Sequence, residues 1–116
     1  MLTVREYLTH GGRNPFREWL GTLDVAVRAR VQARVLRFEQ GNLGDHKSVG
    51  SGVWEARLAF GPGYRIYFGK DGEAVILLLV GGAKSTQRRE IPRAQEFGAT
   101  TFRTRSIGSC DRSSCG

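Results

Sequence analysis

Residues 54–68 read WEARLAFGPGYRIYF, and this stretch decides the fold. Apolar side chains alternate with polar or small ones along residues 54–60 and again along residues 64–68. This period of two is typical of a strand with one buried face. The intervening Gly61-Pro62-Gly63 is a turn sequence. The stretch therefore predicts an antiparallel hairpin.

Alternation divides the side chains of this hairpin between two faces of a sheet. The face expected to meet the core carries Trp54, Leu58, Tyr64 and Ile66. The opposite face carries Glu55, Arg57, Arg65 and Tyr67, and Lys84 and Arg88 follow the next strand closely enough to join them. Cations with one carboxylate suit phosphodiester chemistry without a metal, because cations stabilise charge on the phosphate and a polar group must move a proton. The alternative interpretation is a solvated sheet face without a site.

The rest of the chain supplies further elements. Residues 74–80 are apolar at every position, as in a central strand covered on both faces. A helix over about residues 24–40 is expected because its apolar side chains form one stripe, made by Val27, Val31, Val35 and Phe38. The other expected elements are a strand over residues 2–7, a short helix from Asn14-Pro15 to about residue 20, a loop over residues 42–52 and a weak helix over residues 86–97.

This order, β-α-α-β-β-β-α, predicts an α+β fold. We expect a small antiparallel sheet with two N-terminal helices packed on it and a C-terminal helix. A chain of 116 residues has room for one domain. We place that domain at residues 1–98. Residues 99–116 are rich in Ser, Thr, Arg and Gly, and they predict a flexible tail, for which a non-native extension is one explanation.

Charge indicates the kind of partner. The net charge is +7, and fifteen of the eighteen basic residues are Arg. Arg binds phosphate and carboxylate through planar pairs of hydrogen bonds, so an anionic partner is expected, either nucleic acid or an acidic protein.

Several other classes of protein find no support in the sequence. His10 and His46 stand alone, and Cys110 and Cys115 have no partner ligands, so we expect neither a metal nor another cofactor. No phosphate-cradling glycine loop of the Walker type is present. The apolar run of residues 74–80 is too short to cross a membrane, and the first residues lack the pattern of a signal peptide. A cytoplasmic protein without membrane contact is expected.

Four segments carry a resemblance to a known family. They are NPFREWL (residues 14–20), GDHK (residues 44–47), GPGYRIYF (residues 61–68) and GGAKS (residues 81–85). In this order they resemble the RelE/ParE superfamily of toxins from bacterial toxin–antitoxin modules. The nearest branch is the HigB-like "addiction module killer protein" group, and the resemblance covers about residues 3–97.

The resemblance implies a microbial RNase-like fold and an endoribonuclease that cleaves mRNA on the ribosome. In this family the 2′-hydroxyl attacks the phosphate without a metal. The resemblance implies catalytic roles for Arg65 at the scissile phosphate, for Arg57 and Lys84 at neighbouring basic positions, and for Glu55 as a proton acceptor. It implies RNA-binding roles for Lys47, Arg88 and Tyr67.

The resemblance also implies partners. A cognate antitoxin protein is expected to neutralise the toxin, and operator DNA is expected to be reached only through that antitoxin. Three alternatives stay open. Phe97-Gly98 stands where relatives often carry Tyr or His, which leaves a catalytically degenerate member as one alternative. The others are a non-nucleolytic inhibitor of DNA gyrase, of the ParE type, and a basic module that acts as co-repressor on DNA.

Overall fold

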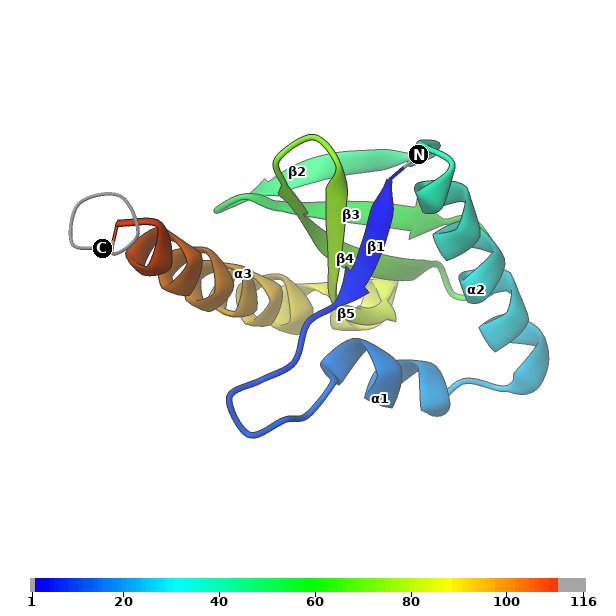
Figure 1. The fold of residues 1–116 in the computed structure, drawn as a ribbon. Helices are drawn as coiled ribbons and strands as arrows, with labels where there is room; N and C mark the ends of the chain where they lie inside the picture. Colours follow the sequence, from blue (N-terminus) through cyan, green and yellow to red (C-terminus); the bar gives the residue numbers. More distant parts are fainter. Residues whose placement is uncertain (1, 111–116) are drawn as a thin grey trace.

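The computed structural model describes the backbone of residues 2–110 and the side chains of residues 2–99. The described strands form one mixed sheet in the order β1-β5-β4-β3-β2 (Figure 1). They are β1 (Thr3–Glu6), β2 (His46–Gly50), β3 (Val53–Leu58), β4 (Tyr64–Asp71) and β5 (Val75–Ala83). β1 runs parallel to β5, and every other neighbouring pair is antiparallel.

A side chain caps the start of the first helix, and a glycine follows the end of the second. The helices are α1 (Pro15–Gly21), α2 (Val25–Glu39), the short 3-10 helix η1 (Lys84–Thr86) and α3 (Gln87–Cys110). The Asn14 side chain accepts a hydrogen bond of 3.0 Å from the Arg17 backbone N–H, which caps α1 as expected. Gly41 has a φ of 87° just after α2, the left-handed conformation that commonly ends a helix. No helix in the described part of the chain is both long and apolar enough to cross a membrane.

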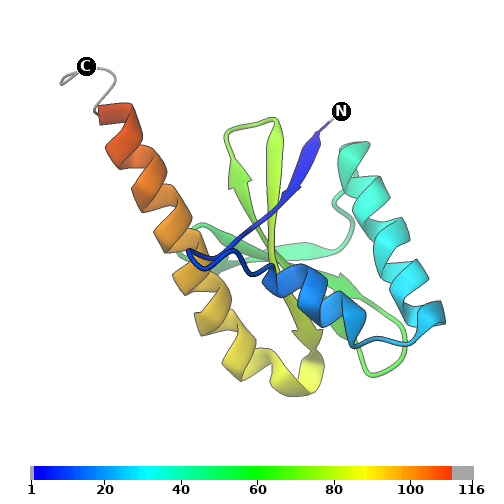
Figure 2. The same cartoon turned by 60° about the horizontal axis from the view of Figure 1, so that its bottom comes forward.

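Helices cover both faces of the sheet (Figure 2). On one face, α1 and α2 pack against alternate residues of β3, β4 and β5 and bury Phe16, Leu20, Val31, Phe38, Ala56, Leu58, Ile66, Phe68, Ile76 and Leu78. On the other face, α3 packs on a second core that contains Tyr7, Val53, Tyr67, Leu79, Val80 and Ala94. Because the central strands are covered twice, β4 is buried at residues 66–69 and β5 is buried along most of its length.

Two glycines of β5 let the helices approach the sheet closely. A Cβ atom on Gly81 would lie 2.1 Å from the Trp19 ring of α1, and one on Gly82 would lie 2.9 Å from Cγ of Glu90 on α3. A side chain at either position would push a helix away from the sheet. This explains why the apolar run of residues 74–80 is followed by two glycines within the same strand.

Gly81→Ala is expected to lower the free energy of unfolding by about 1–3 kcal/mol, because the added methyl group overpacks the contact with Trp19. Urea unfolding followed by far-UV circular dichroism measures this loss. Gly21→Ala is the matched control, since no atom lies within 4 Å of the Cβ position there. Equal stability of the two variants would contradict the close approach of α1 to β5.

The predicted α+β class, the hairpin and the three helices are confirmed, but the predicted order was wrong in one strand. Residues 46–50 were expected in a loop, yet they form β2 at the edge of the sheet. This strand is polar and half-exposed, so its sequence lacks the alternation that marks a buried strand. The sheet is also mixed rather than purely antiparallel, because β1 pairs in parallel with β5, far along the chain.

A helix crosses the expected end of the domain at residue 98. α3 continues across that position to Cys110, so the first part of the predicted tail is helical. Its composition, rich in Ser, Thr and Gly, has low helix propensity and concealed the continuation. Residues 111–116 of the predicted tail lie outside the described residues.

Candidate functional site

The register of β2, β3 and β4 places most of the predicted site residues side by side. Arg57 lies directly opposite Arg65, and Glu55 lies directly opposite Tyr67. Lys47 on the edge strand is the partner of Glu55 on its other side. Directly paired residues on neighbouring strands project from the same face of the sheet, so these five side chains share one face.

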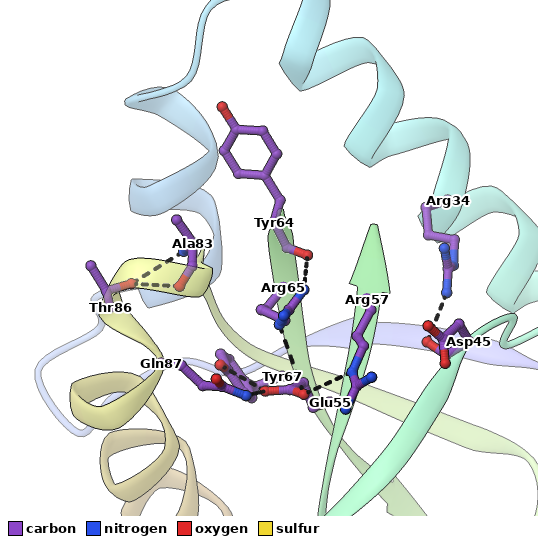
Figure 3. A network of polar contacts seen from close by, with 10 residues as sticks. All are labelled: Arg34, Asp45, Glu55, Arg57, Tyr64, Arg65, Tyr67, Ala83, Thr86 and Gln87. Carbon is purple, nitrogen blue, oxygen red and sulfur yellow. Dashed lines mark hydrogen bonds and ion pairs between the residues drawn. The ribbon is translucent and has the colours of Figure 1, made fainter. Parts of the chain in front are cut away.

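The carboxylate of Glu55 is the centre of this group. Its residue is fully buried, and its two oxygens meet side chains from β3, β4 and α3 (Figure 3). Oε2 accepts hydrogen bonds from the Tyr67 hydroxyl at 3.1 Å and from Nε2 of Gln87 at 2.7 Å. Oε1 lies 3.4 Å from Nε of Arg57 and 3.8 Å from Nε of Arg65. We call Glu55, Arg57, Arg65, Tyr67 and Gln87 the Glu55 cluster.

Part of the predicted face is therefore closed. We expected Glu55 and Tyr67 on an open polar face, but both are fully buried. The reason is α3, which packs over Tyr67 and brings Gln87 onto the Glu55 carboxylate. A carboxylate surrounded by donors and removed from solvent cannot reach a substrate proton directly. The geometry makes Glu55 a residue that positions its neighbours.

The Tyr67 hydroxyl is also committed within the cluster. Burial, and next the adjacent Glu55 carboxylate, raise the pKa of this phenol well above its usual value. Tyr67 therefore stays protonated, and its hydroxyl donates a hydrogen bond to Glu55. The Tyr67 ring is fully buried and offers no surface to RNA in this structure, and its RNA-binding role stays a prediction.

Tyr67→Phe is expected to lower the free energy of unfolding by about 1 kcal/mol near neutral pH, because the Glu55 oxygen loses a buried donor. The pH dependence carries a second signature. Above about pH 10 the unfolded chain releases the phenolic proton while the folded chain retains it, so stability falls by about 1.4 kcal/mol per pH unit through this group. This fraction of the decline should be missing in Tyr67→Phe. Parallel decline of both proteins between pH 10 and 11 would contradict the assignment.

The two arginines leave different amounts of guanidinium accessible. The side chain of Arg57 is 36% exposed and that of Arg65 is 11% exposed. Nε of Arg65 is buried and has no hydrogen-bond partner among the described residues. Like charges directly opposite one another destabilise a sheet, so this pair depends on the Glu55 carboxylate between them. Two arginines held together in this way form a ready contact for an anion with several oxygens.

Lys84 lies beside Arg65 at the end of β5. Its backbone N–H donates to the carbonyl of Gly63 at 2.8 Å. A Cβ atom on Gly63 would lie 3.6 Å from Cβ of Lys84 and 3.7 Å from Nη1 of Arg65. Gly63 has a φ of 82°, so the turn is shaped by a residue that adopts the left-handed region freely. The structure thus brings the exposed Lys84 to the same end of the sheet as Arg65.

The other two predicted RNA-binding residues lie at the margin of the cluster. Lys47 is exposed on β2, and Arg88 is exposed on the first turn of α3. Neither makes a hydrogen bond or ion pair with the cluster within the part of the chain that the structure describes. Their positions extend the basic surface and leave the Glu55 cluster itself unchanged.

Gln87 is the member of the cluster that sequence reasoning missed. It is the first residue of α3, after η1 turns the chain at the end of β5. The Thr86 hydroxyl fixes this turn, because it accepts from the Ala83 N–H and donates to the Ala83 carbonyl, both at 3.1 Å. The motif GGAKS at residues 81–85 marked the turn in the sequence, but the direction in which α3 leaves it was not readable.

The chemistry of the site is that of an anion-binding surface. No group of three metal-ligating side chains occurs among the described residues. The accessible groups of the site are the cations of Arg57, Arg65 and Lys84, with Lys47 and Arg88 at the margin. Such an arrangement can hold a phosphate and stabilise negative charge that develops on it.

Comparison with known proteins places the chain beside one bacterial relative. No protein-family model matches the chain. A protein of Haemophilus influenzae, named only as an uncharacterized protein, is 41% identical over 88 residues. The match covers 72% of this chain and 89% of the relative. At this identity and coverage the two sequences share one family, and the chain belongs to the family of this Haemophilus influenzae protein.

Proposed function

We propose that this protein is the toxin of a bacterial type II toxin–antitoxin module and acts as an mRNA endoribonuclease on the ribosome. The sequence resemblance to the RelE/ParE superfamily, in its HigB-like branch, suggests the activity. The α+β architecture and the basic end of the sheet are compatible with it.

The observation that carries the proposal is the pair of arginines that lie directly opposite each other, Arg57 and Arg65. A fold gains no stability from facing two cations across neighbouring strands. Here the buried Glu55 carboxylate offsets their repulsion and fixes their direction. Local departures from good packing of this kind are expected where a protein binds a ligand.

Each cation has a role in this mechanism. Arg65 contacts the scissile phosphate, and Arg57 and Lys84 stabilise the charge that develops on its oxygens. Lys47 and Arg88 bind the RNA backbone on either side. Glu55 holds the arginines without touching RNA, which replaces the role of proton acceptor expected from the sequence. The 2′-hydroxyl of the RNA is the nucleophile: its oxygen bonds to phosphorus as the bond from phosphorus to the 5′-oxygen breaks. Water accepts the proton of the 2′-hydroxyl and gives a proton to the leaving 5′-oxygen, so the step needs no metal and no other cofactor.

The proposal includes partners and a location. The toxin acts in the cytoplasm on ribosomes that carry mRNA. A cognate antitoxin with an acidic contact segment covers the basic surface. The antitoxin, and not the toxin, binds operator DNA in the complex. Charge complementarity with a surface of net positive charge makes such a partner bind rapidly.

Cell-free translation of a reporter mRNA tests the proposal. Purified protein is added with and without ribosomes, and the 5′ ends of the mRNA are mapped by primer extension. New ends at ribosome-occupied codons, absent without ribosomes, are expected. Intact mRNA and undiminished translation would contradict the nuclease.

A second candidate is a non-nucleolytic inhibitor of the gyrase type. One observation favours it: Glu55 is enclosed by donors and Tyr67 keeps its proton, so neither is available to accept a proton from RNA. A supercoiling assay with purified gyrase separates the two candidates. Inhibited supercoiling together with intact mRNA would select the inhibitor.

A further inference from the structure

A second group of arginines lies on the opposite side of the sheet from the Glu55 cluster. Arg30, Arg34 and Arg37 of α2 line an open pocket of about 200 Å³ against residues 58–60, which are the end of β3 and the start of the turn between β3 and β4. This volume is below the range of about 300–1,000 Å³ that drug-sized ligands occupy. The pocket suits a small group better than a whole organic ligand.

Arg34 is built into the wall of this pocket. Its Nη2 donates to the carbonyls of Leu43 and Asp45, both at 3.1 Å, and Figure 3 shows it reaching from α2 toward Asp45. Gly44 lies under the guanidinium with a φ of 64°, and a Cβ atom there would lie only 2.6 Å from Nη2. Nε of Arg34 is buried without a hydrogen-bond partner among the described residues. The side chain is fixed, yet one of its donors is unused.

Charge around the pocket is unbalanced. Burial, and next the positive charge of Arg37, lower the pKa of Arg34, and Asp45 offsets this only in part. Arg30 is oriented by the Phe60 ring, with its guanidinium carbon 4.2 Å from the ring centroid. Three arginines therefore line one small space, and the carboxylate near them that partly offsets the charge, Asp45, acts on Arg34 from outside the pocket lining. An anion placed there would relieve their repulsion.

The number of donors indicates which anion. A phosphate group carries a charge of roughly −1.5 to −2 at neutral pH and offers three strongly accepting oxygens. A carboxylate offers one charge and two oxygens. Guanidinium groups bind phosphate through parallel pairs of hydrogen bonds. Three arginines match the charge and the oxygens of phosphate more closely than those of a carboxylate.

We propose that the pocket between α2 and the β3–β4 turn binds a phosphate group through Arg30, Arg34 and Arg37. The site shares no side chain with the Glu55 cluster, so phosphate binding there does not depend on the proposed nuclease activity. The phosphate is either a free ion or part of a nucleic-acid chain, since both present the same oxygens.

Titration of the ¹⁵N-labelled protein with inorganic phosphate, at ionic strength held constant with chloride, tests the site. Saturable shifts of the backbone amide signals of Ala33, Ala59 and Phe60 are expected. Arg37→Gln, which changes an exposed residue of the pocket, should weaken phosphate binding about tenfold. Arg5→Gln removes the same charge from the exposed face of β1 and should leave binding unchanged. Arg34→Gln should abolish binding, provided that its spectrum stays that of a folded protein.

Further titrations identify the source of the phosphate. A short oligoribonucleotide that shifts the same amides at far lower concentration than inorganic phosphate assigns the site to a nucleic-acid backbone. Equal concentrations assign it to the free ion. The proposal is overturned if phosphate shifts no pocket amides, or if Arg37→Gln and Arg5→Gln bind phosphate alike. It is also overturned if poly-glutamate shifts these amides and phosphate does not, because the pocket would then recognise an acidic protein.

Discussion

Glu55→Ala is expected to lower the free energy of unfolding by about 3 kcal/mol, the usual consequence of removing one partner from a buried ion pair. The carboxylate accepts from Tyr67 and Gln87 and lies next to both arginines. Without it, the Tyr67 hydroxyl loses its acceptor inside the second core, and Arg65 faces Arg57 without a counter-charge. Both effects act on the folded state, so they add to the loss.

Urea unfolding of three variants measures this effect. Glu55→Gln keeps the volume and one accepting oxygen but loses the charge, so we expect a smaller loss of about 1–2 kcal/mol. Glu73→Ala is the matched control, since it removes an exposed carboxylate beside β5 and should change stability by less than about 0.5 kcal/mol. A Glu55→Ala protein as stable as Glu73→Ala would refute the central position of this carboxylate.

Arg65→Ala is expected to reduce ribosome-dependent mRNA cleavage by about 100-fold or more, the usual effect of losing a group that stabilises charge in the transition state. The guanidinium of Arg65 lies next to Gly63 of the turn and beside the Glu55 carboxylate, which orients it. Arg65→Lys keeps the charge and loses the planar pair of donors, so an intermediate rate is expected. The measured quantity is the rate at which new 5′ ends appear under single-turnover conditions.

Stability must be measured beside the rate, because Arg65 is a largely buried partner of Glu55. Circular dichroism at the assay temperature separates loss of folding from loss of chemistry. Arg5→Gln again serves as the control for charge, since it lies on the exposed side of β1. If folded Arg65→Ala cleaves at the rate of Arg5→Gln, Arg65 has no role at the phosphate.

The hairpin could be predicted because alternation specifies which residues face each other. Once residues 54–68 are assigned to two strands around Gly61-Pro62-Gly63, the sharing of one face by Glu55, Arg57, Arg65 and Tyr67 follows from the pleat. Assigning the faces of β3 and β4 required no information about where the helices pack. The strand register confirms that these four side chains share one face.

The environment of that face could not be predicted from the same pattern. Whether Glu55 is exposed depends on where α3 docks, and Gln87 stands 32 residues further along the chain. The docking in turn depends on Gly82, whose missing side chain leaves space for Glu90 and Thr86. From the alternation alone, a polar residue on the outer face of a strand is predicted to be exposed, even where a helix covers it in the structure. The edge strand β2 was missed for a related reason. It pairs only with β3 in the described sheet, and its residues are exposed or half-exposed, so they need not be apolar.

The central claim is that Arg57 and Arg65 together contact phosphate, and the salt dependence of RNA binding tests it most directly. Affinity of a single-stranded oligoribonucleotide is measured by fluorescence anisotropy from low to physiological salt for wild type, Arg57→Ala, Arg65→Ala and Arg5→Gln. Affinity falls as salt rises, and each lost phosphate contact makes the slope of log affinity against log salt less steep by about 0.7. We expect this decrease in both arginine variants and an unchanged slope in Arg5→Gln. Equal slopes in all four proteins would contradict the claim.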